Sequence, residues 1–233
     1  MDAIQPILAL KDVRYRWPGR ASFALDIEGF QIARSERVLL LGESGSGKST
    51  LLSLICGTIT AAAGSVTVAG TDIAALSAGK RDRFRAEQIG LIFQQVNLLP
   101  YASVLDNILL PLRFAPLRRT TVPNPSQTAR QLCTDLGLPP EPVPAQAGTL
   151  RVGQQQRVAA ARALIGAPPL IIADEPTSAL DAATQASFLD LLFAQTRAAQ
   201  STLLMVSHDA RLAPQFDRVV QMQDLTRTAE LAQ

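Results

Sequence analysis

The sequence predicts an α/β fold, because three continuous apolar runs alternate with helical patterns along a chain of 233 residues. The runs are Val38–Leu41, Leu170–Ala173 and Leu203–Val206. Continuous apolar stretches of this length are typical of strands buried on both faces of a parallel sheet. Apolar residues with helical spacing over Ser49–Cys56 and Asp181–Ala199 predict the helices between them. A chain of this length forms one large domain, or a core with a smaller insertion.

The N-terminal part predicts a small antiparallel sheet. Residues 1–35 alternate short apolar and polar stretches around the turn signal Pro18-Gly19, and Gly64–Ile73 has the pattern of strand, turn and strand. This sheet is expected to join the α/β core.

The middle of the chain predicts an inserted helical subdomain. Nine of the 15 prolines lie between Pro100 and Pro144. They bracket one helix expected to open at Ser103 and a second expected to run from Ser126 to Gly137. We therefore expect a single domain over 1–233, with a core formed by 1–94 and 155–233 and a helical insertion at 95–154.

Composition excludes several functional classes. The net charge is only +2, from 22 basic and 20 acidic residues, so no nucleic-acid partner is expected. Cys56 and Cys133 lack metal-ligand spacing and are expected to be reduced structural thiols. No apolar run approaches the roughly 18–20 residues that span a bilayer, and no signal peptide is expected at the start. A membrane role would therefore require a partner.

A glycine-rich motif predicts a phosphate-binding loop. It follows the apolar run ending at Leu41 and precedes a helical pattern, as such a loop requires. Its backbone N–H groups would surround a phosphate at the positive end of the next helix. Lys48 is expected to reach the β- and γ-phosphates, and the Ser49 hydroxyl to bind Mg²⁺. The candidate nucleotide ligands are Gly42, Glu43, Ser44, Gly45, Ser46, Gly47, Lys48, Ser49 and Thr50.

Two carboxylates predict hydrolysis rather than phosphoryl transfer. The buried run starting at Leu170 ends in Asp174 and Glu175. Beside the phosphate-binding loop, Asp174 can hold Mg²⁺ through water. Glu175 lies one residue further out, where it can accept a proton from an attacking water molecule.

These residues carry a family resemblance. The segment LIIADEPTSALD, Leu170 to Asp181, resembles the Walker B motif and D-loop of ABC-type ATPases, and QQQRVAAARAL resembles the helix after their signature motif. The resemblance implies a P-loop NTPase (RecA-like) core in the ABC ATPase architecture. It also implies a head-to-tail dimer around two ATP molecules with Mg²⁺, each ATP lying between the loop of one subunit and the signature of the other.

The resemblance assigns further residues. Gln94 matches the Q-loop glutamine, which contacts Mg²⁺ or the attacking water and leads into the helical subdomain. Asp181 matches the D-loop aspartate that acts across the dimer interface. His208 is the only histidine and matches the switch histidine at the γ-phosphate. The adenine is expected to stack on Trp17, which precedes Pro-Gly, with Tyr15 as the alternative.

The signature motif departs from the family pattern. Where the family has L-S-G-G-Q, this chain has Leu150 followed by Arg151, Val152, Gly153 and Gln154. Arg151 could act as a cationic clamp on the partner's γ-phosphate. Alternatively, Val152 restricts the backbone and the site binds ATP but closes poorly. The sequence leaves both open.

Segments such as FQQVNLLP and VLDNILLPL resemble the stand-alone ATPase subunits of the lipoprotein-releasing and macrolide-exporter branch. That branch implies a homodimer, or a heterodimer with a second ATPase subunit, which drives an integral-membrane permease. It also implies a peripheral location at the cytoplasmic face of the inner membrane. An ATP-gated regulatory or mechanotransmission module with weak hydrolysis remains an alternative, as does a non-transport ABC ATPase.

Overall fold

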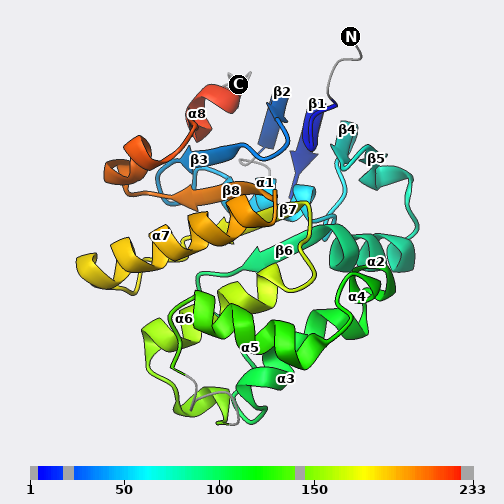
Figure 1. Ribbon diagram of the computed structural model, residues 1–233. Helices are drawn as coiled ribbons and strands as arrows, with labels where there is room; N and C mark the ends of the chain where they lie inside the picture. The colour runs from blue at the N-terminus through cyan, green and yellow to red at the C-terminus, as the bar shows by residue number, and fades with distance from the viewer. Residues whose placement is uncertain (1–4, 18–23, 140–144, 227–233) are drawn as a thin grey trace.

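The computed structural model describes residues 5–17, 24–139 and 145–226, so the predicted Pro18-Gly19 turn lies outside the described residues. Within those ranges, none of the helices combines the length and apolar character needed to cross a membrane. Figure 1 shows the antiparallel strands at one end of the molecule and a group of helices at the other, with a second sheet between them.

The central sheet is parallel and confirms the α/β prediction. Its strand order is β6-β7-β8-β3-β9. Along β3, Val38 and Leu40 pack on one side of the sheet, whereas Leu39 and Leu41 pack on the other. Burial on both faces explains why the sequence run is continuously apolar. The strands are β3 (Arg37–Leu41), β6 (Ile89–Ile92), β7 (Leu170–Asp174), β8 (Thr202–Ser207) and β9 (Arg218–Gln221).

The second sheet is antiparallel, with the order β2-β1-β4-β5. Strand β1 pairs with both β2 and β4, and the predicted strand-turn-strand at Gly64–Ile73 forms the pair β4 and β5. The strands are β1 (Leu8–Arg16), β2 (Ala24–Ile32), β4 (Ala63–Val68) and β5 (Thr71–Asp72).

Helices of the core flank the parallel sheet. Helix α1 (Lys48–Ile55) follows β3, and α7 (Ala182–Ala198) begins at the N-cap Asp181. Helix α2 (Ala78–Gln88) leads into β6, and the short α8 (Met222–Leu225) follows β9. The two long helical patterns of the sequence thus correspond to α1 and α7.

The middle of the chain folds as helices, which Figure 1 shows gathered in one lobe. Ser103 caps α3 by accepting from the Asp106 N–H at 3.0 Å. The second helix begins at Pro125 rather than Ser126, because Asn124 accepts from the Gln127 N–H as its N-cap. The helices are α3 (Val104–Leu109), α4 (Pro116–Thr120), α5 (Pro125–Asp135) and α6 (Val152–Leu164). Helix α6 is continuous across residue 155, where the sequence places a subdomain boundary.

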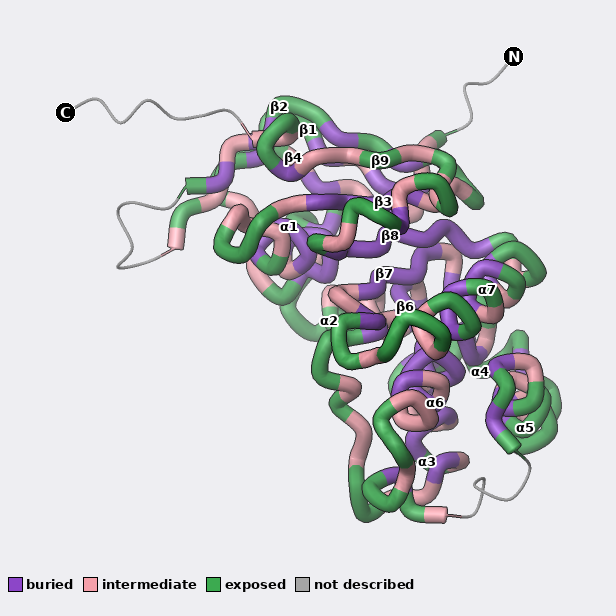
Figure 2. Tube along the Cα trace, turned by 90° about the vertical axis from the view of Figure 1, so that its left-hand side faces the viewer, coloured by how far each residue is buried: buried purple, intermediate pink, exposed green. Residues whose placement is uncertain are grey.

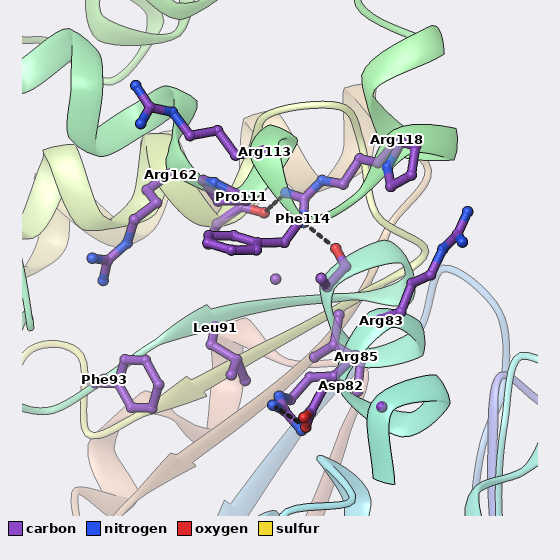
Figure 3. A pocket seen from close by; sticks show the side chains of 16 residues that line it. Asp82, Arg83, Arg85, Leu91, Phe93, Pro111, Arg113, Phe114, Arg118 and Arg162 are labelled. Atoms are coloured by element: carbon purple, nitrogen blue, oxygen red, sulfur yellow. Dashed lines mark hydrogen bonds and ion pairs between the residues drawn. The ribbon is translucent and has the colours of Figure 1, made fainter. Parts of the chain in front are cut away.

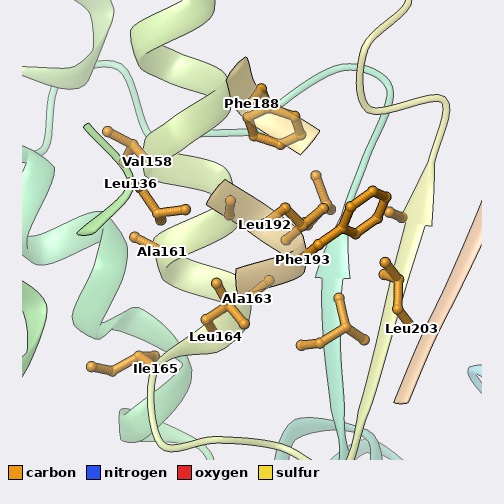
Figure 4. Packing of buried hydrophobic residues seen from close by; sticks show 14 of the residues in the cluster. Leu136, Val158, Ala161, Ala163, Leu164, Ile165, Phe188, Leu192, Phe193 and Leu203 are labelled. Atoms are coloured by element: carbon orange, nitrogen blue, oxygen red, sulfur yellow. The ribbon is translucent and has the colours of Figure 1, made fainter. Parts of the chain in front are cut away.

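Two apolar cores lie on opposite faces of the parallel sheet, and Figure 2 shows the buried strands running through the centre. One core joins the antiparallel sheet and α1 to the strands. The other joins α3, α5, α6 and α7 to the opposite face. In Figure 4, Phe188, Leu192 and Phe193 of α7 lie between the strands and the small side chains of α6. Helix α6 is therefore fixed against both the sheet and the helical lobe.

Candidate functional site

The carboxyl ends of β3 and β7 open into a cavity of about 340 Å³. A volume of this order suits a small-molecule ligand, and the position is the usual ligand edge of an open α/β sheet. Every residue that lines it is one that the sequence singled out: Ser44, Gly45, Gly47, Lys48, Ser49, Thr50, Gln94, Asp174, Glu175 and His208.

The loop between β3 and α1 adopts a conformation that requires glycine. Gly45 and Gly47 have φ values of +82° and +100°, which side-chain-bearing residues rarely adopt. At Gly42, a Cβ atom would lie 2.7 Å from the Ser46 hydroxyl oxygen. The Lys48 ammonium group donates to the carbonyl oxygens of Gly42 and Glu43 at 2.6 and 2.7 Å, which holds its charge over the loop.

This loop fits a phosphate group. Its helix, α1, starts at Lys48 and directs its free backbone N–H groups and positive dipole at the cavity. The Ser46 Oγ atom is buried and has no hydrogen-bond partner among the described residues. A buried hydroxyl without a partner is costly, so this atom is suited to an additional acceptor or donor.

Asp174 and Glu175 occupy different environments at the end of β7. Burial raises the pKa of Asp174, the neighbouring Glu175 carboxylate raises it further, and Lys48 opposes both effects. Glu175 has a positive φ of 46°, and its N–H donates to the Val206 carbonyl oxygen at 3.0 Å. Such a backbone conformation is costly for a non-glycine residue and persists where the surroundings fix it, as they often do at functional sites.

His208 lies directly against Glu175. Its Nδ1 atom is 2.9 Å from Oε1 and 3.0 Å from Oε2 of the carboxylate. The histidine side chain is 68% exposed, whereas that of Glu175 is 12% exposed. The pair therefore places an exposed imidazole beside a shielded carboxylate at the mouth of the cavity.

Three oxygen donors on the cavity wall suit Mg²⁺. The Ser49 hydroxyl, the Gln94 amide oxygen and the Asp174 carboxylate belong to the same lining. In the described ranges, no cluster of three or more His, Cys, Asp or Glu side chains could hold a metal by itself. Mg²⁺ prefers such a sparse set, because it keeps several waters and shares the phosphates of its nucleotide.

Trp17 and Tyr15, the two candidates for adenine stacking, contact each other edge to face, with ring centroids 5.3 Å apart. The Trp17 indole N–H donates to the Thr50 hydroxyl at 3.1 Å, which ties the ring to α1. Tyr15 instead packs against the core beneath the antiparallel sheet. Of the two rings, Trp17 is the one bonded to a residue of the cavity wall.

The remaining predicted ligands lie elsewhere. Gly42, Glu43 and Ser46 line an adjoining cavity together with His208. Asp181 caps α7 and accepts from the Ala183 and Thr184 N–H groups at 3.1 and 3.0 Å. These hydrogen bonds, above all those from Thr184, lower the pKa of Asp181.

The signature segment forms the start of α6. Arg151 is its exposed N-cap, and the Arg151 N–H donates to the Gln154 side chain at 3.1 Å. Val152 is helical with negative φ and 54% exposed, so the backbone here does not need the freedom of glycine. A Cβ atom at Gly153 would lie 3.3 Å from the Thr184 methyl group, so the signature adjoins the start of α7 rather than the cavity.

Sequence reasoning missed two residues near the site. The Ser207 hydroxyl lies 3.5 Å from Glu175 Oε2 and accepts from the Asp209 N–H at 3.0 Å. Arg162 of α6 binds the main chain that follows Gln94. The only sequence signal for Ser207 is its position directly before His208. No local sequence signal indicates Arg162.

Comparison with known proteins identifies relatives over most of the chain. A family model described as ABC transporter matches residues 25–178. The chain is 37% identical over 222 residues to the lipoprotein-releasing system ATP-binding protein LolD of Pseudomonas fluorescens, which covers 94% of this chain and 95% of that protein. It is 39% identical over 223 residues to the macrolide export ATP-binding/permease protein MacB of Shigella flexneri, covering 94% of this chain and 33% of that protein.

Solved structures of ABC cassettes resemble this chain as well. The dimeric structure of MJ0796, a bacterial ABC transporter cassette, superposes with a TM-score of 0.78 at 30% identity, covering 92% of this chain and 93% of that one. A post-hydrolysis dimer of the same cassette bound to ADP and phosphate gives a TM-score of 0.76, with the same identity and coverage. The chain belongs to the ABC transporter family, of which it is an ATP-binding and ATP-hydrolysing member.

Proposed function

We propose that two copies of this chain associate head to tail around two ATP·Mg²⁺ and drive a separate membrane permease. The observation that carries this proposal is the separation of the site residues into two groups. The phosphate loop and carboxylates line one cavity, whereas Arg151, Gly153 and Asp181 gather at the adjoining starts of α6 and α7. A second copy would present the second group to the cavity of the first.

The residues in and around the cavity have the following roles in the proposed cycle. Lys48 and the loop amides bind the β- and γ-phosphates, and Trp17 stacks on the adenine. Ser49, Gln94 and Asp174 would hold Mg²⁺, which neutralises phosphate charge when bound. Glu175 orients or deprotonates the attacking water, and His208 stabilises the charge that develops on the γ-phosphate. Release of ADP and phosphate lets the dimer open.

The permease is proposed to dock in a groove of about 730 Å³ between α2, β6 and the segment before α4. Figure 3 shows Leu91, Phe93, Pro111 and Phe114 along this groove, with Arg83 and Arg113 near its edges. Phe114 is 64% exposed and Phe93 38%. An apolar floor with basic edges suits an amphipathic segment that carries an acidic residue. This docking would hold the chain at the cytoplasmic face of the inner membrane. In support, LolD is named for a lipoprotein-releasing system and MacB for macrolide export with a permease.

Co-purification tests the docking surface. Phe114→Glu is expected to lose the permease from detergent-solubilised membranes while ATP turnover continues. The matched control is Tyr101→Glu, which changes an aromatic residue that is 73% exposed and lies outside the groove. Equal retention of the permease by both variants would place the docking surface elsewhere.

The altered signature favours one alternative function, an ATP-gated regulatory or mechanotransmission module with weak hydrolysis. Its support is the pair Arg151 and Val152 at the start of α6, where the family pattern has Ser and Gly. The presence of both carboxylates, Lys48 and His208 in one cavity supports hydrolysis instead.

Replacement of Glu175 separates these two functions. Glu175→Gln is expected to lower kcat on the order of 10²- to 10⁴-fold, the usual contribution of a general base, and to leave ATP affinity nearly unchanged. Phosphate release and binding of a fluorescent ATP analogue measure the two quantities. The control is Asp190→Asn, an exposed carboxylate on α7. Equally slow hydrolysis by the native chain and Glu175→Gln would favour the regulatory module.

A further inference from the structure

Helix α6 carries a buried arginine that holds the main chain just after Gln94. Arg162 is only 9% exposed. Its two terminal guanidinium nitrogens donate to the carbonyl oxygens of Val96 and Asn97, each at 2.7 Å. These partners precede Arg162 by 66 and 65 positions, so the contact joins distant parts of the chain.

The backbone held in this way is strained. Asn97 has a positive φ of 47°, a conformation that asparagine tolerates better than most residues but that still costs free energy. A second side chain fixes the next turn: Asn107 of α3, fully buried, accepts from the Leu99 N–H at 2.8 Å and donates to the Leu99 carbonyl oxygen at 3.0 Å. Residues 96–99 are therefore held between α6 and α3.

Gln94 lies two residues before the first of these anchors and lines the nucleotide cavity. One exposed residue, Gln95, separates it from Val96. With so short a connection, the direction of the Gln94 side chain depends on where Arg162 holds the Val96 and Asn97 carbonyls.

Packing alone does not explain an arginine at this position. Burial lowers the pKa of Arg162, because the charged guanidinium loses its hydration. Among the described residues, no carboxylate forms an ion pair with Arg162, so the main-chain carbonyls are the partners that compensate for the buried charge. An apolar side chain of similar volume could pack here without the cost of burying a charge. It could not donate hydrogen bonds to two carbonyl oxygens.

We propose that Arg162 is a positioning residue that ties Gln94 to helix α6, so that the geometry of the nucleotide cavity and the position of α6 change together. The inference rests on the proposed function, in which the start of the same helix, at Arg151, meets the partner's ATP. The 13 residues of α6 span roughly 20 Å, so the helix would connect the two ATP sites of a dimer.

Turnover measurements on matched variants test this connection. Arg162→Met keeps most of the side-chain volume and removes both hydrogen bonds. Arg157→Met is the control, because Arg157 lies on the same helix and also binds a main-chain carbonyl, that of Leu136, but makes no contact with the Gln94 segment. We expect kcat to fall about ten- to a hundredfold for Arg162→Met, a loss typical of misplaced catalytic groups. Arg157→Met is expected to lose less than about twofold, and ATP affinity to stay nearly constant in both.

A double-mutant cycle shows whether Arg162 acts through Gln94. In a Gln94→Ala background, Arg162→Met is expected to cause no further loss of kcat. Arg162→Lys, whose single nitrogen can bind one carbonyl, is expected to be intermediate. This variant also keeps the test valid if Arg162→Met fails to fold. Independent losses from Gln94→Ala and Arg162→Met, or equal losses in the Arg162 and Arg157 variants, would overturn the proposal.

Hydrogen exchange supplies a readout that does not depend on turnover. ATP should slow amide exchange of residues 95–99 in the native chain and in Arg157→Met. In Arg162→Met, amide exchange of residues 95–99 should be faster and insensitive to ATP, whereas exchange in α6 should be unchanged. If the native chain does not hydrolyse ATP, the proposed function fails. The amide exchange of residues 95–99 then tests the proposed role of Arg162 by itself. Identical exchange in the native chain and in Arg162→Met would contradict that role.

Discussion

At the scale of single residues, the charge of Asp174 lowers the stability of the fold. Its carboxylate is partly buried next to Glu175, and both features raise its pKa above the ordinary value. A raised pKa means that the folded state binds the proton more tightly than the unfolded state. The charge therefore destabilises the fold above the raised pKa, and this cost disappears below the unfolded pKa of about 3.9.

Asp174→Asn is accordingly expected to stabilise the nucleotide-free chain at neutral pH. The Tm of Asp174→Asn should exceed that of the native chain, because the substitution removes the partly buried charge. The difference from the native chain should shrink as the pH falls toward about 4, and Mg²⁺-dependent ATP binding should be lost. Thermal unfolding at several pH values measures the first effect. A lower Tm for Asp174→Asn at neutral pH would mean that the carboxylate is stabilising.

At the scale of secondary-structure elements, the starts of α6 and α7 have local capping roles, and the proposed dimer would add intermolecular ones. Asp181 is the N-cap of α7, and the bonds from Ala183 and Thr184 lower its pKa. The stability that the cap supplies is therefore present above the ordinary Asp pKa and is lost as the pH falls through the lowered value.

Two substitutions separate these roles of Asp181. Asp181→Ala should lower Tm, because the cap is lost, whereas Asp181→Asn should keep most of the stability, because asparagine also caps helices. If Asp181 acts across a dimer interface through its charge, both variants should lose turnover about tenfold or more. Recovery of turnover together with stability in Asp181→Asn would limit Asp181 to capping.

The start of α6 makes a separate prediction about the altered signature. Combining Arg151→Ser with Val152→Gly restores the family pattern. If Arg151 clamps the partner's γ-phosphate, turnover should fall on the order of tenfold or more. The control is Arg130→Ser, an exposed arginine on α5. Unchanged turnover would exclude the clamp, and a large gain would show that the native signature slows the site.

The elements differ in how far the sequence could predict them. Val38–Leu41 was predictable, because burial on both faces demands a continuous apolar run. Helix α2 was not, because its sequence has no apolar stripe and its one buried residue is Glu87. That carboxylate accepts from the Leu117 and Arg118 N–H groups at 3.0 and 2.7 Å, a contact that depends on tertiary structure.

The same limit applies to the site. All ten residues of the cavity lie in local motifs: spacing indicated the phosphate-binding loop and the two carboxylates, whereas the family resemblance indicated Gln94 and His208. The role of Arg162 arises from contacts with residues more than 60 positions away, and no local pattern encodes them. Sequence patterns are therefore a good guide to the candidate nucleotide ligands. They are a poor guide to residues, such as Arg162, that are proposed to position those ligands.

At the scale of the whole molecule, the predicted site residues lie in two separate places, so the proposed ATP site would need two copies of the chain. The cavity contains the phosphate loop and carboxylates, while the signature adjoins α7, away from that cavity. Docking at the groove beside α4 would transmit movement of the helical lobe to a membrane partner. In the proposed dimer, each chain would supply half of each ATP site.

The molecular mass of Glu175→Gln in solution tests this pairing most directly. Slow hydrolysis in this variant should preserve the bound ATP and the closed state. Light scattering is expected to give twice the 24.9 kDa chain mass with ATP and Mg²⁺, and the single-chain mass with ADP. A single-chain mass at saturating ATP and high protein concentration would contradict the head-to-tail dimer.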